Sequence, residues 1–348
     1  MNLMDCIAML LAAKANPALI DNEGASALHY AAQHNHIDAI KLLATSAALT
    51  NVEDQNGANP LMWAAAGNHE AAIQTLLDCG AEVNHVDKSG RSALHTAVYG
   101  GSVECTTLLL DAKADEAIAD ASGQTALFSA CNEGRVDLAA ILLKYGSDPR
   151  VQDVEARTPA HWAAIVGHGD VVELLVHQFQ QYFWTIPLCI SPSFTTLTCH
   201  ATCILNVVPM LMVLAIAHAY GACNSIMPDV MPDSRLQVTE SPEIMSDPDE
   251  RGETIMHYSA FFGHPEIVAY LITVEADINA QDYDGITALH WGALKGNTAI
   301  VRQLCEAGVY TNYMEANGAK STAYDYAVNG GFDECAAVIA EYGGTFWG

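Results

Sequence analysis

The sequence predicts a solenoid, a stack of one repeated structural unit, and three observations support this prediction. A glycine stands three residues after a recurring acidic residue in every unit but one, where Ala156 takes its place. A Leu-Leu or similar apolar pair closes each unit. Such self-similarity at a constant period is the sequence signature of repeat proteins. The acidic residues, most of them spaced by 33 residues, are Asp21, Asp54, Asp87, Asp120, Asp153, Asp249, Asp282 and Glu315.

The start of each unit has the chemistry of a turn that leads into a helix. The Asp-x-x-Gly pattern is turn chemistry, because glycine adopts positive φ at no steric cost. A Ser or Thr followed by Ala or Pro then suits a helix N-cap and first turn. The clearest copies continue into Leu-His, as in Ser26-Ala27-Leu28-His29. Small Ala-Ala pairs allow neighbouring helices to approach closely, and one unit cannot bury its Leu-Leu face alone, so stacking supplies the stability.

This pattern resembles the ankyrin repeat over about four fifths of the chain. The resemblance implies an all-α ankyrin-repeat solenoid, in which each unit is a β-turn and two antiparallel helices, interrupted by a long irregular or apolar insertion. We expect these parts in chain order: an N-terminal half repeat at 1–20, repeats one to five at 21–177, the insertion at 178–248, repeats six to eight with a C-terminal cap at 249–344, and a tail at 345–348.

Three departures from the pattern carry expectations of their own. If position 156 needs positive φ, Ala156 costs about 1 kcal/mol relative to glycine. In the last unit Tyr324-Asp325 replaces Leu-His, and the unit contains one extra residue. The chain also begins in mid-repeat, since residues 5–11 align with the second helix of a unit. We expect missing sequence before Met1 or an incomplete gene model, the alternative being that something else covers this apolar edge.

The insertion is uncharged over most of its length, with no Asp, Glu, Lys or Arg between Glu173 and Asp229. Residues 203–220 are almost long and apolar enough to cross a bilayer, but no Lys or Arg flanks them. Residues 224–248 have the composition of a flexible acidic linker. Three interpretations stay open: non-native sequence such as a translated intron, a genuine loop between repeats, and a membrane segment over 182–220, as a hairpin or a single span.

The composition excludes some classes of partner. The chain has 41 acidic and 14 basic residues and a formal net charge of −27. This field repels phosphate backbones and anionic lipid headgroups, so we expect no nucleic-acid partner, and a basic protein surface fits better. Ten scattered cysteines indicate a reducing compartment. Without an apparent secretory signal, we expect the cytoplasm, with the nucleus as an alternative.

We find no catalytic constellation in the sequence and expect no enzyme activity, no cofactor and no small-molecule substrate. A series of histidines recurs once per repeat, and such spacing is too wide for the residues to share a metal ion. Cys199-His200-x-x-Cys203 has no second ligand pair at the spacing of a zinc site. We therefore predict no metal. The histidines, which in the family help to hydrogen-bond the turn network, are His29, His95, His161, His257 and His290.

The position directly after Leu-His is aromatic in six of eight units, and Thr96 and Ser129 occupy the other two. In ankyrin arrays this position lies on the first helix, near the concave groove. Aromatic side chains with a polar tip are typical binding anchors, although they also pack between repeats. Variable turn tips, such as Lys88 and Arg91, would set specificity. The predicted partner-binding residues are Tyr30, Trp63, Trp162, Tyr258, Trp291 and Tyr326.

Two asparagines match a modification pattern known in this family. Asn84 and Asn279 each have a leucine eight residues before them and an acidic and an aliphatic residue directly before them. The resemblance implies that they are substrates of the asparaginyl hydroxylase that acts on ankyrin repeats.

Our leading hypothesis is an intracellular scaffold or adaptor that binds a protein through its concave groove and turn tips. One alternative is the ankyrin-repeat portion of a larger membrane protein or enzyme. Another is a membrane-associated protein anchored by residues 182–220. The fold cannot name the partner, because one scaffold serves many unrelated functions.

Overall fold

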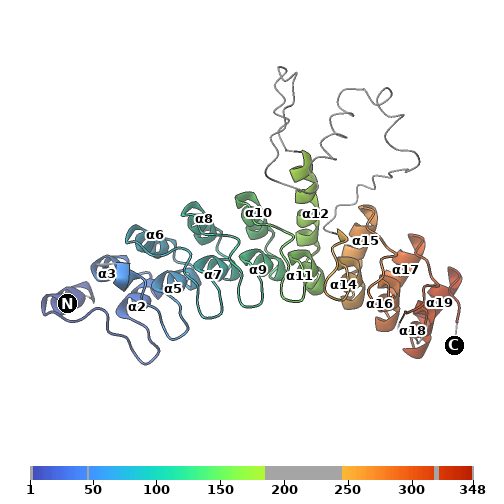
Figure 1. The fold of residues 1–348 in the computed structure, drawn as a ribbon, viewed down its shortest axis with the longest axis horizontal. Helices are drawn as coiled ribbons and strands as arrows, with labels where there is room; N and C mark the ends of the chain where they lie inside the picture. The colour runs from blue at the N-terminus through green and yellow to red at the C-terminus, as the bar shows by residue number, and fades with distance from the viewer. Residues whose placement is uncertain (1–2, 45–46, 185–244, 317–320, 347–348) are drawn as a thin grey trace, which may run out of the picture. The chain divides into compact units, whose positions relative to one another are not determined.

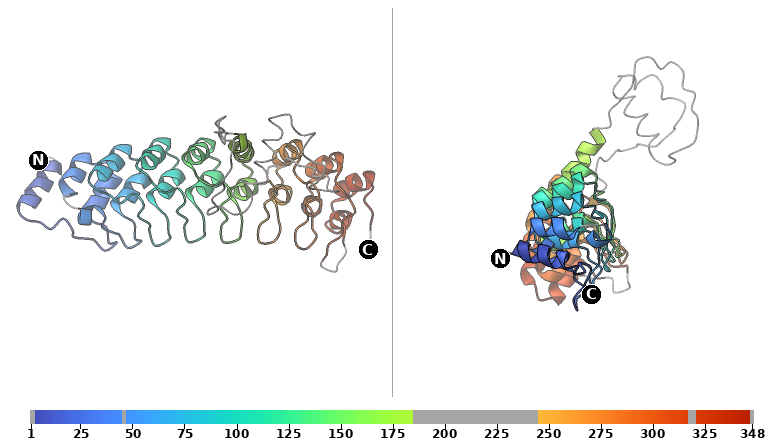
Figure 2. Two further views of the ribbon diagram at one scale, coloured as in Figure 1. Left: turned by 45° about the horizontal axis from the view of Figure 1, so that its top comes forward. Right: turned by 90° about the vertical axis from the view of Figure 1, so that its left-hand side faces the viewer.

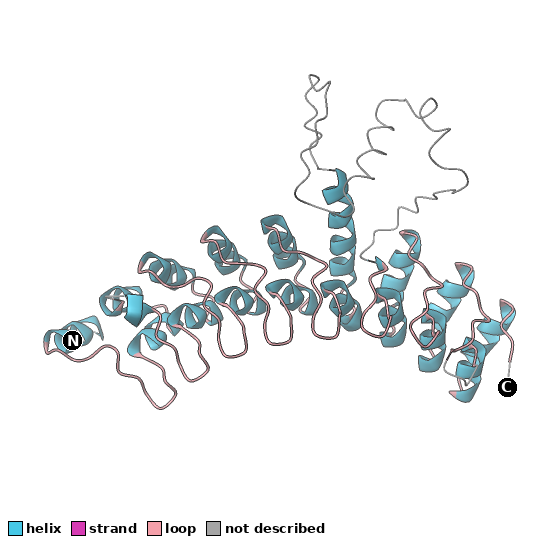
Figure 3. Ribbon diagram, in the orientation of Figure 1, coloured by secondary structure: helices cyan, strands magenta, loops and turns pink. Residues whose placement is uncertain are grey.

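A computed structural model describes residues 3–44, 47–184, 245–316 and 321–346. Within these ranges the regular structure is helical, and the expected all-α solenoid is confirmed (Figure 3). Isolated antiparallel β-bridges close three of the hairpin turns between repeats. They pair Ile20 with Ser26, Val86 with Ser92 and Gln281 with Thr287.

The first helix of each repeat is short and begins at a Ser, Thr or Asn N-cap with extended backbone, as at Ser26 with φ −88° and ψ 166°. Helices of seven or eight residues are marginal alone in water, so their stability comes from packing. These first helices are α2 (Ala27–Gln33), α5 (Pro60–Ala66), α7 (Ala93–Tyr99), α9 (Ala126–Asn132), α11 (Pro159–Val166), α14 (Ile255–Phe262), α16 (Ala288–Lys295) and α18 (Ala323–Asn329).

The second helix of each repeat runs back beside the first and forms a second layer (Figure 1). A one-turn helix, α4 (Ala47–Thr50), follows the second helix of repeat one. The second helices are α3 (Ile37–Leu43), α6 (Glu70–Asp78), α8 (Val103–Asp111), α10 (Val136–Tyr145), α12 (Gly169–Trp184), α15 (Pro265–Thr273), α17 (Thr298–Glu306) and α19 (Asp333–Glu341).

The core lies between these two layers and continues from repeat to repeat. First helices pack against first helices of adjacent repeats, and the leucine and small residues of the repeat pattern fill the contact. In repeat two, Leu61, Ala64 and Ala65 are fully buried. Alanine at these positions lets two backbones approach closely without leaving a void, which explains the Ala-Ala pair of the sequence pattern.

The hairpin turns project from one side of the stack and are joined to one another by backbone hydrogen bonds (Figure 2). The N–H of Gln55 donates to the carbonyl of Glu23 in the previous repeat, at 2.9 Å. The N–H of Lys88 donates to Asn56 in the same way, at 2.9 Å. This ladder continues along the array and fixes the spacing of the turn tips.

Repeats five and six stack directly, although the insertion separates them in the sequence. The N–H of Glu250 donates to the carbonyl of Glu155 at 3.1 Å, which continues the ladder of turn tips. Nε2 of His264 lies 3.2 Å from the carbonyl of Ile165. The guanidinium of Arg150 forms an ion pair with Asp247 at 2.8 Å. These contacts join the two blocks of repeats into one continuous array.

Residues 185–244 of the insertion lie outside the described residues, and with them most of the predicted loop, linker and membrane segments. Residues 178–184, which the sequence assigns to the insertion, continue helix α12. No helix in the described ranges is both long and apolar enough to cross a membrane. At the other end of the array, α1 (Leu3–Ala12) packs against α3 in the second-helix layer. Met9 and Leu10 on α1 are more than half exposed, at 55% and 59%.

The structure also shows how two departures from the repeat are accommodated. Ala156 does adopt positive φ, at 59°, where other repeats have glycine. Asp325 takes the place of the repeat histidine in the last unit. Its Oδ2 accepts hydrogen bonds from the N–H of Thr322 at 2.7 Å and from the Thr322 hydroxyl at 2.9 Å. The Asp325 carboxylate therefore accepts the hydrogen bonds of the helix N-cap that the histidine accepts in the repeats that carry it.

Candidate functional site

The buried histidines connect the first helix of their own repeat to the turn of the next repeat by hydrogen bonds. In repeat five, Nδ1 of His161 accepts a hydrogen bond from the N–H of Thr158 at 3.1 Å, and Nε2 lies 3.1 Å from the carbonyl of Glu253 in the next repeat. Because Nδ1 accepts from a backbone N–H, the proton sits on Nε2 and the imidazole is neutral. Burial lowers the pKa of His161 and thereby keeps it neutral.

The same geometry recurs at the other four histidines, so each is committed to its own repeat and the next. Among the described residues, no group of three or more His, Cys, Asp and Glu side chains is arranged to hold a metal ion. The predicted weak motif at Cys199-His200-x-x-Cys203 lies outside the described part of the chain. The four equivalent histidines are His29, His95, His257 and His290.

The aromatic residues after Leu-His have a structural role that the sequence did not reveal. Each turn aspartate uses Oδ1 to bind two backbone N–H groups of its own turn, as Asp54 does with Asn56 and Ala58 at 2.7 and 2.9 Å. The other carboxylate oxygen, Oδ2, can then accept a hydrogen bond from a side chain. In repeat two the indole N–H of Trp63 donates to Oδ2 of Asp54 at 2.9 Å. The aromatic side chain therefore fixes the hairpin of its own repeat.

Three further repeats share this pair. The hydroxyl of Tyr30 donates to Asp21 at 2.6 Å, and this hydrogen bond lowers the pKa of Asp21. The indole of Trp162 donates to Asp153 at 2.9 Å and the hydroxyl of Tyr258 to Asp249 at 2.8 Å. The hydrogen bond between the turn aspartate and the aromatic residue nine positions later therefore recurs in repeats one, two, five and six.

The two C-terminal aromatics depart from this geometry. The indole N–H of Trp291 is buried and, within the described residues, has no hydrogen-bond partner. Its ring packs edge-on against Phe261, with centroids 5.0 Å apart. Tyr326 lies near Glu315, and burial together with that carboxylate raises the pKa of Tyr326 to about 12.

Repeats three and four lack the aromatic side chain, and a groove opens there. Thr96 and Ser129 stand where the other repeats carry Trp or Tyr. The groove has a volume of about 740 Å³ and extends from Trp63 in repeat two to Trp162 in repeat five. We call it the central groove. Small residues at its centre and tryptophans at its ends explain its extent.

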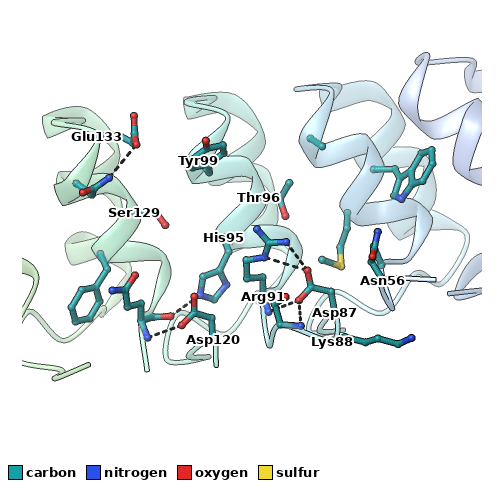
Figure 4. A pocket seen from close by; sticks show the side chains of 18 of the residues that line it. Asn56, Asp87, Lys88, Arg91, His95, Thr96, Tyr99, Asp120, Ser129 and Glu133 are labelled. Atoms are coloured by element: carbon teal, nitrogen blue, oxygen red, sulfur yellow. Dashed lines mark hydrogen bonds and ion pairs between the residues drawn. The ribbon is translucent and has the colours of Figure 1, made fainter. Parts of the chain in front are cut away.

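Figure 4 shows how the lining residues come from both the first helices and the turn tips. Tyr99 at the end of α7 is 71% exposed and stands at the rim. The carboxylates at the groove outnumber its cationic groups, which are Lys88 and Arg91. The residues that line the groove are Asp54, Asn56, Ala58, Met62, Trp63, Ala66, Asp87, Lys88, Ser89, Arg91, His95, Thr96, Tyr99, Asp120, Gln124, Phe128, Ser129, Asn132, Glu133 and Trp162.

The cationic groups of the groove are held by neighbouring groups of the protein. The guanidinium of Arg91 binds Oδ2 of Asp87 through Nε at 3.2 Å and Nη2 at 3.1 Å. The ammonium of Lys88 donates to the carbonyl of Gln55 at 2.7 Å. Arg91 thus supplies in repeat three the hydrogen bond that an aromatic supplies in repeats one, two, five and six.

The structure brings two of the six predicted partner-binding residues to this groove, Trp63 and Trp162. The remaining four are Tyr30, Tyr258, Trp291 and Tyr326, and they do not line it. Sequence reasoning missed Asp120 and Tyr99. The interruption of the aromatic series at repeats three and four was the signal that could have located them.

The two asparagines predicted to be hydroxylated both bind the following repeat. Oδ1 of Asn84 accepts a hydrogen bond from the N–H of Asp115 at 2.8 Å. Oδ1 of Asn279 accepts one from the N–H of Tyr310, also at 2.8 Å. Asn84 is exposed and Asn279 is half-buried. Their geometry explains why asparagine stands at this position, and the modification itself stays a prediction.

Comparison with known proteins agrees with the repeat architecture seen in the structure. A family model described as ankyrin repeats (3 copies) matches residues 2–87, 72–153, 119–185 and 211–315. The chain is 32% identical over 101 residues to the calmodulin-binding transcription activator CBT of Oryza sativa subsp. japonica, which covers 28% of this chain and 11% of that protein.

Two further relatives differ in their named functions. Palmitoyltransferase AKR1 of Lachancea kluyveri is 31% identical over 81 residues, 23% of this chain and 11% of its own. Protein phosphatase 1 regulatory subunit 12A of Mus musculus is 36% identical over 81 residues, 22% of this chain and 7% of its own. The chain therefore spans about a tenth of the length of the curated relatives it matches.

Proposed function

Because this chain belongs to the ankyrin-repeat family, we propose that it is a protein–protein interaction scaffold or adaptor whose partner binds in the central groove and at the adjoining turn tips. The observation that supports this proposal is the central groove itself. Its volume of about 740 Å³, its two flanking tryptophans and its mixture of polar and apolar lining side chains are features of a site for a polypeptide segment.

The tryptophans at the two ends are suited to act as anchors. Trp63 and Trp162 each use the indole N–H to bind the turn aspartate of their own repeat, so their rings are held in place before a partner arrives. Large rings with fixed orientation lose little entropy on binding, which makes them efficient contact residues. Tyr30, Tyr258, Trp291 and Tyr326 would contribute only to a partner that extends beyond the groove.

A basic partner segment fits the charge of this surface. The groove is lined by Asp54, Asp87, Asp120 and Glu133, and the chain carries a formal net charge of −27. Opposite charge accelerates encounter and suppresses acidic competitors such as nucleic acid.

Other features of the protein follow from this proposal. We expect the cytoplasm as its compartment and no catalysis by the chain itself. We retain the division into repeats at 21–177 and 249–344, with the insertion between them. Since the matched relatives are much longer proteins, the array serving as the recognition part of a larger protein is the alternative arrangement.

The substitution Ser129→Trp tests the groove without removing a side-chain hydrogen bond seen in the described residues. A tryptophan at this position would resemble Trp63 and Trp162, donate to Asp120 and occupy the groove. Peptides are first selected on the full chain from a random displayed library, and their affinities are then measured by fluorescence anisotropy. We expect Ser129→Trp to weaken their binding by about 10-fold or more, because the groove is filled.

The matched control is Gln74→Trp, which adds the same side chain at an exposed position on α6 outside the groove. It should bind the selected peptides with unchanged affinity. Equal binding to wild type and Ser129→Trp would show that the peptides use another surface, and the proposed site would be wrong.

A further inference from the structure

We propose that the central groove recognises an arginine side chain of its partner, and that Asp120 in repeat four is the residue that binds it. This inference rests on the proposed function, because it specifies the chemistry of the same groove. Its basis is a hydrogen bond that repeats one, two, three, five and six complete within themselves and that repeat four leaves open inside the groove. Repeat seven leaves the same bond open at Asp282, but Asp282 does not line the central groove.

The open position is one oxygen of Asp120. Its Oδ1 accepts hydrogen bonds from the N–H of Ser122 at 2.8 Å and of Gln124 at 3.0 Å, as in the other turns. Among the described residues, Oδ2 receives no hydrogen bond. In repeats one, two, five and six an aromatic side chain nine residues later supplies it, and in repeat four that position is Ser129, whose hydroxyl makes no hydrogen bond to Asp120 among the described residues.

Repeat three shows which group fills such a position in this protein. Thr96 also replaces the aromatic there, and Arg91 binds Oδ2 of Asp87 through two guanidinium nitrogens. The residue equivalent to Arg91 in repeat four is Gln124. Its amide nitrogen lies 3.4 Å from Oδ2 of Asp153 in the next repeat, so it does not serve Asp120. A guanidinium from a partner would bind Oδ2 of Asp120 in repeat four as Arg91 binds Oδ2 of Asp87 in repeat three.

The surroundings of Asp120 favour arginine over the other donors. The aromatic place next to Ser129 is empty space within the groove, and Phe128 and Trp162 border the groove nearby. A planar guanidinium fits a flat apolar site and binds a carboxylate through two parallel N–H groups, whereas a lysine ammonium is compact and strongly hydrated. Glu133 adds a second carboxylate to the groove.

The experiment uses the peptides selected on the full chain and compares two changes, one on each side of the contact. Asp120→Asn keeps an oxygen for the turn and places an N–H₂ group where Oδ2 was, so the fold is retained while the acceptor is lost. Replacing the arginine of the peptide by lysine removes the bidentate donor. We expect arginine at one fixed position of the selected peptides, and each change should weaken binding by about 10-fold.

A thermodynamic cycle links the two changes. If Asp120 binds the arginine, the two changes together should weaken binding by no more than about either change alone. Asp78→Asn is the matched control, since it removes the same charge from an exposed position on α6. It should leave the affinity unchanged. Equal thermal unfolding midpoints of wild type and Asp120→Asn verify that the variant is folded.

The outcomes separate this inference from the proposed function. Peptides that are blocked by Ser129→Trp but indifferent to Asp120→Asn would overturn the arginine site and leave the groove as a binding site. Enrichment of Tyr or Trp at the fixed position would do the same, since the partner would then supply the missing aromatic. Peptides indifferent to both changes would overturn both proposals.

Discussion

The indole N–H of Trp162 donates a 2.9 Å hydrogen bond to Oδ2 of Asp153, so a residue of the first helix fixes the turn that precedes it. The same pair in repeat seven, Trp291 and Asp282, is not bonded, and the indole N–H of Trp291 has no partner among the described residues. Two tryptophans at equivalent positions therefore differ by one hydrogen bond. This difference allows the contribution of the bond to be measured within one molecule.

Trp162→Phe should lower the free energy of unfolding by about 1 kcal/mol more than Trp291→Phe does, because only Trp162 loses a hydrogen bond to a carboxylate. Both changes keep an aromatic ring, and the ring stacked under Arg157 in repeat five is largely retained. Urea unfolding followed by circular dichroism measures both values. Equal losses in the two variants would show that the bond to Asp153 adds nothing to stability.

Ala156→Gly should raise the free energy of unfolding by about 1 kcal/mol, because Ala156 has a φ of 59° and glycine adopts this conformation without strain. The equivalent residue one repeat earlier is Gly123, at φ 77°. Gly123→Ala is the reciprocal control and should be destabilising, since its new Cβ would lie 3.2 Å from Cα of Asp153. A destabilised Ala156→Gly would contradict the strain at this turn.

The buried histidines should make the protein less stable as the pH falls below about 6.5. Burial lowers the pKa of His257 to about 4 in the folded chain, whereas the unfolded chain takes up a proton near 6.5. The stabilisation from the neutral imidazole is therefore complete above pH 6.5 and is lost as the pH falls toward 4. His257 alone should contribute a slope of up to about 1.4 kcal/mol per pH unit in this window.

A comparison of wild type with His257→Gln between pH 7.5 and pH 5 isolates this residue, because glutamine does not titrate. The variant should be less stable at pH 7.5, and the difference between the two proteins should shrink as the pH falls. Parallel curves for the two proteins would mean that His257 is not held neutral by its burial.

Replacing residues 185–244 with a Gly/Ser linker of about 12 residues should leave repeats five and six stacked. The contacts that join them are made by residues outside this segment, such as Glu155 with Glu250 and Ile165 with His264. The shorter connection should add about 1.4 kcal/mol to the free energy of unfolding through a smaller loop-closure entropy. Two separate unfolding transitions would show instead that the two blocks depend on the insertion.

The predicted hydroxylation of Asn84 and Asn279 should appear as an added oxygen on the peptides that contain them. Oδ1 of each residue binds the next repeat, and a hydroxyl on Cβ would leave that acceptor available. Mass spectrometry of the protein isolated from its source measures the modification. Peptides without added mass would contradict the prediction, and the equivalent Asn312 serves as the internal comparison, since it binds Thr345 in the same way.

The period of the sequence was sufficient to predict the units and the order in which they stack. Asp, Gly and the Ser or Thr cap each determine local backbone geometry, so their positions translate directly into turns and helix starts. The positive φ of Ala156 could be anticipated for the same reason. The contact between Glu155 and Glu250 followed once the two blocks were recognised as one interrupted array.

The groove was harder to predict because it forms where the aromatic residue of the repeat is missing. Trp63 and Trp162 belong to a series that looks uniform in sequence, and only the small side chains of Thr96 and Ser129 between them create the groove. Because Ser129 replaces the aromatic residue, Oδ2 of Asp120 also receives no hydrogen bond from the described residues. The unbonded indole of Trp291 depends on how its ring packs against Phe261, and no local sequence rule encodes that packing.

The ladder of hydrogen bonds between turn tips has a mechanical consequence. In the described part of the chain this ladder ties each repeat to its neighbours, so tension on the ends of the array is carried in series through the interfaces between repeats. A terminal repeat would peel away first and release its 33 residues as slack, roughly 110 Å of extended chain. The protein should therefore lengthen in discrete steps and recoil by the same steps, as an elastic element does.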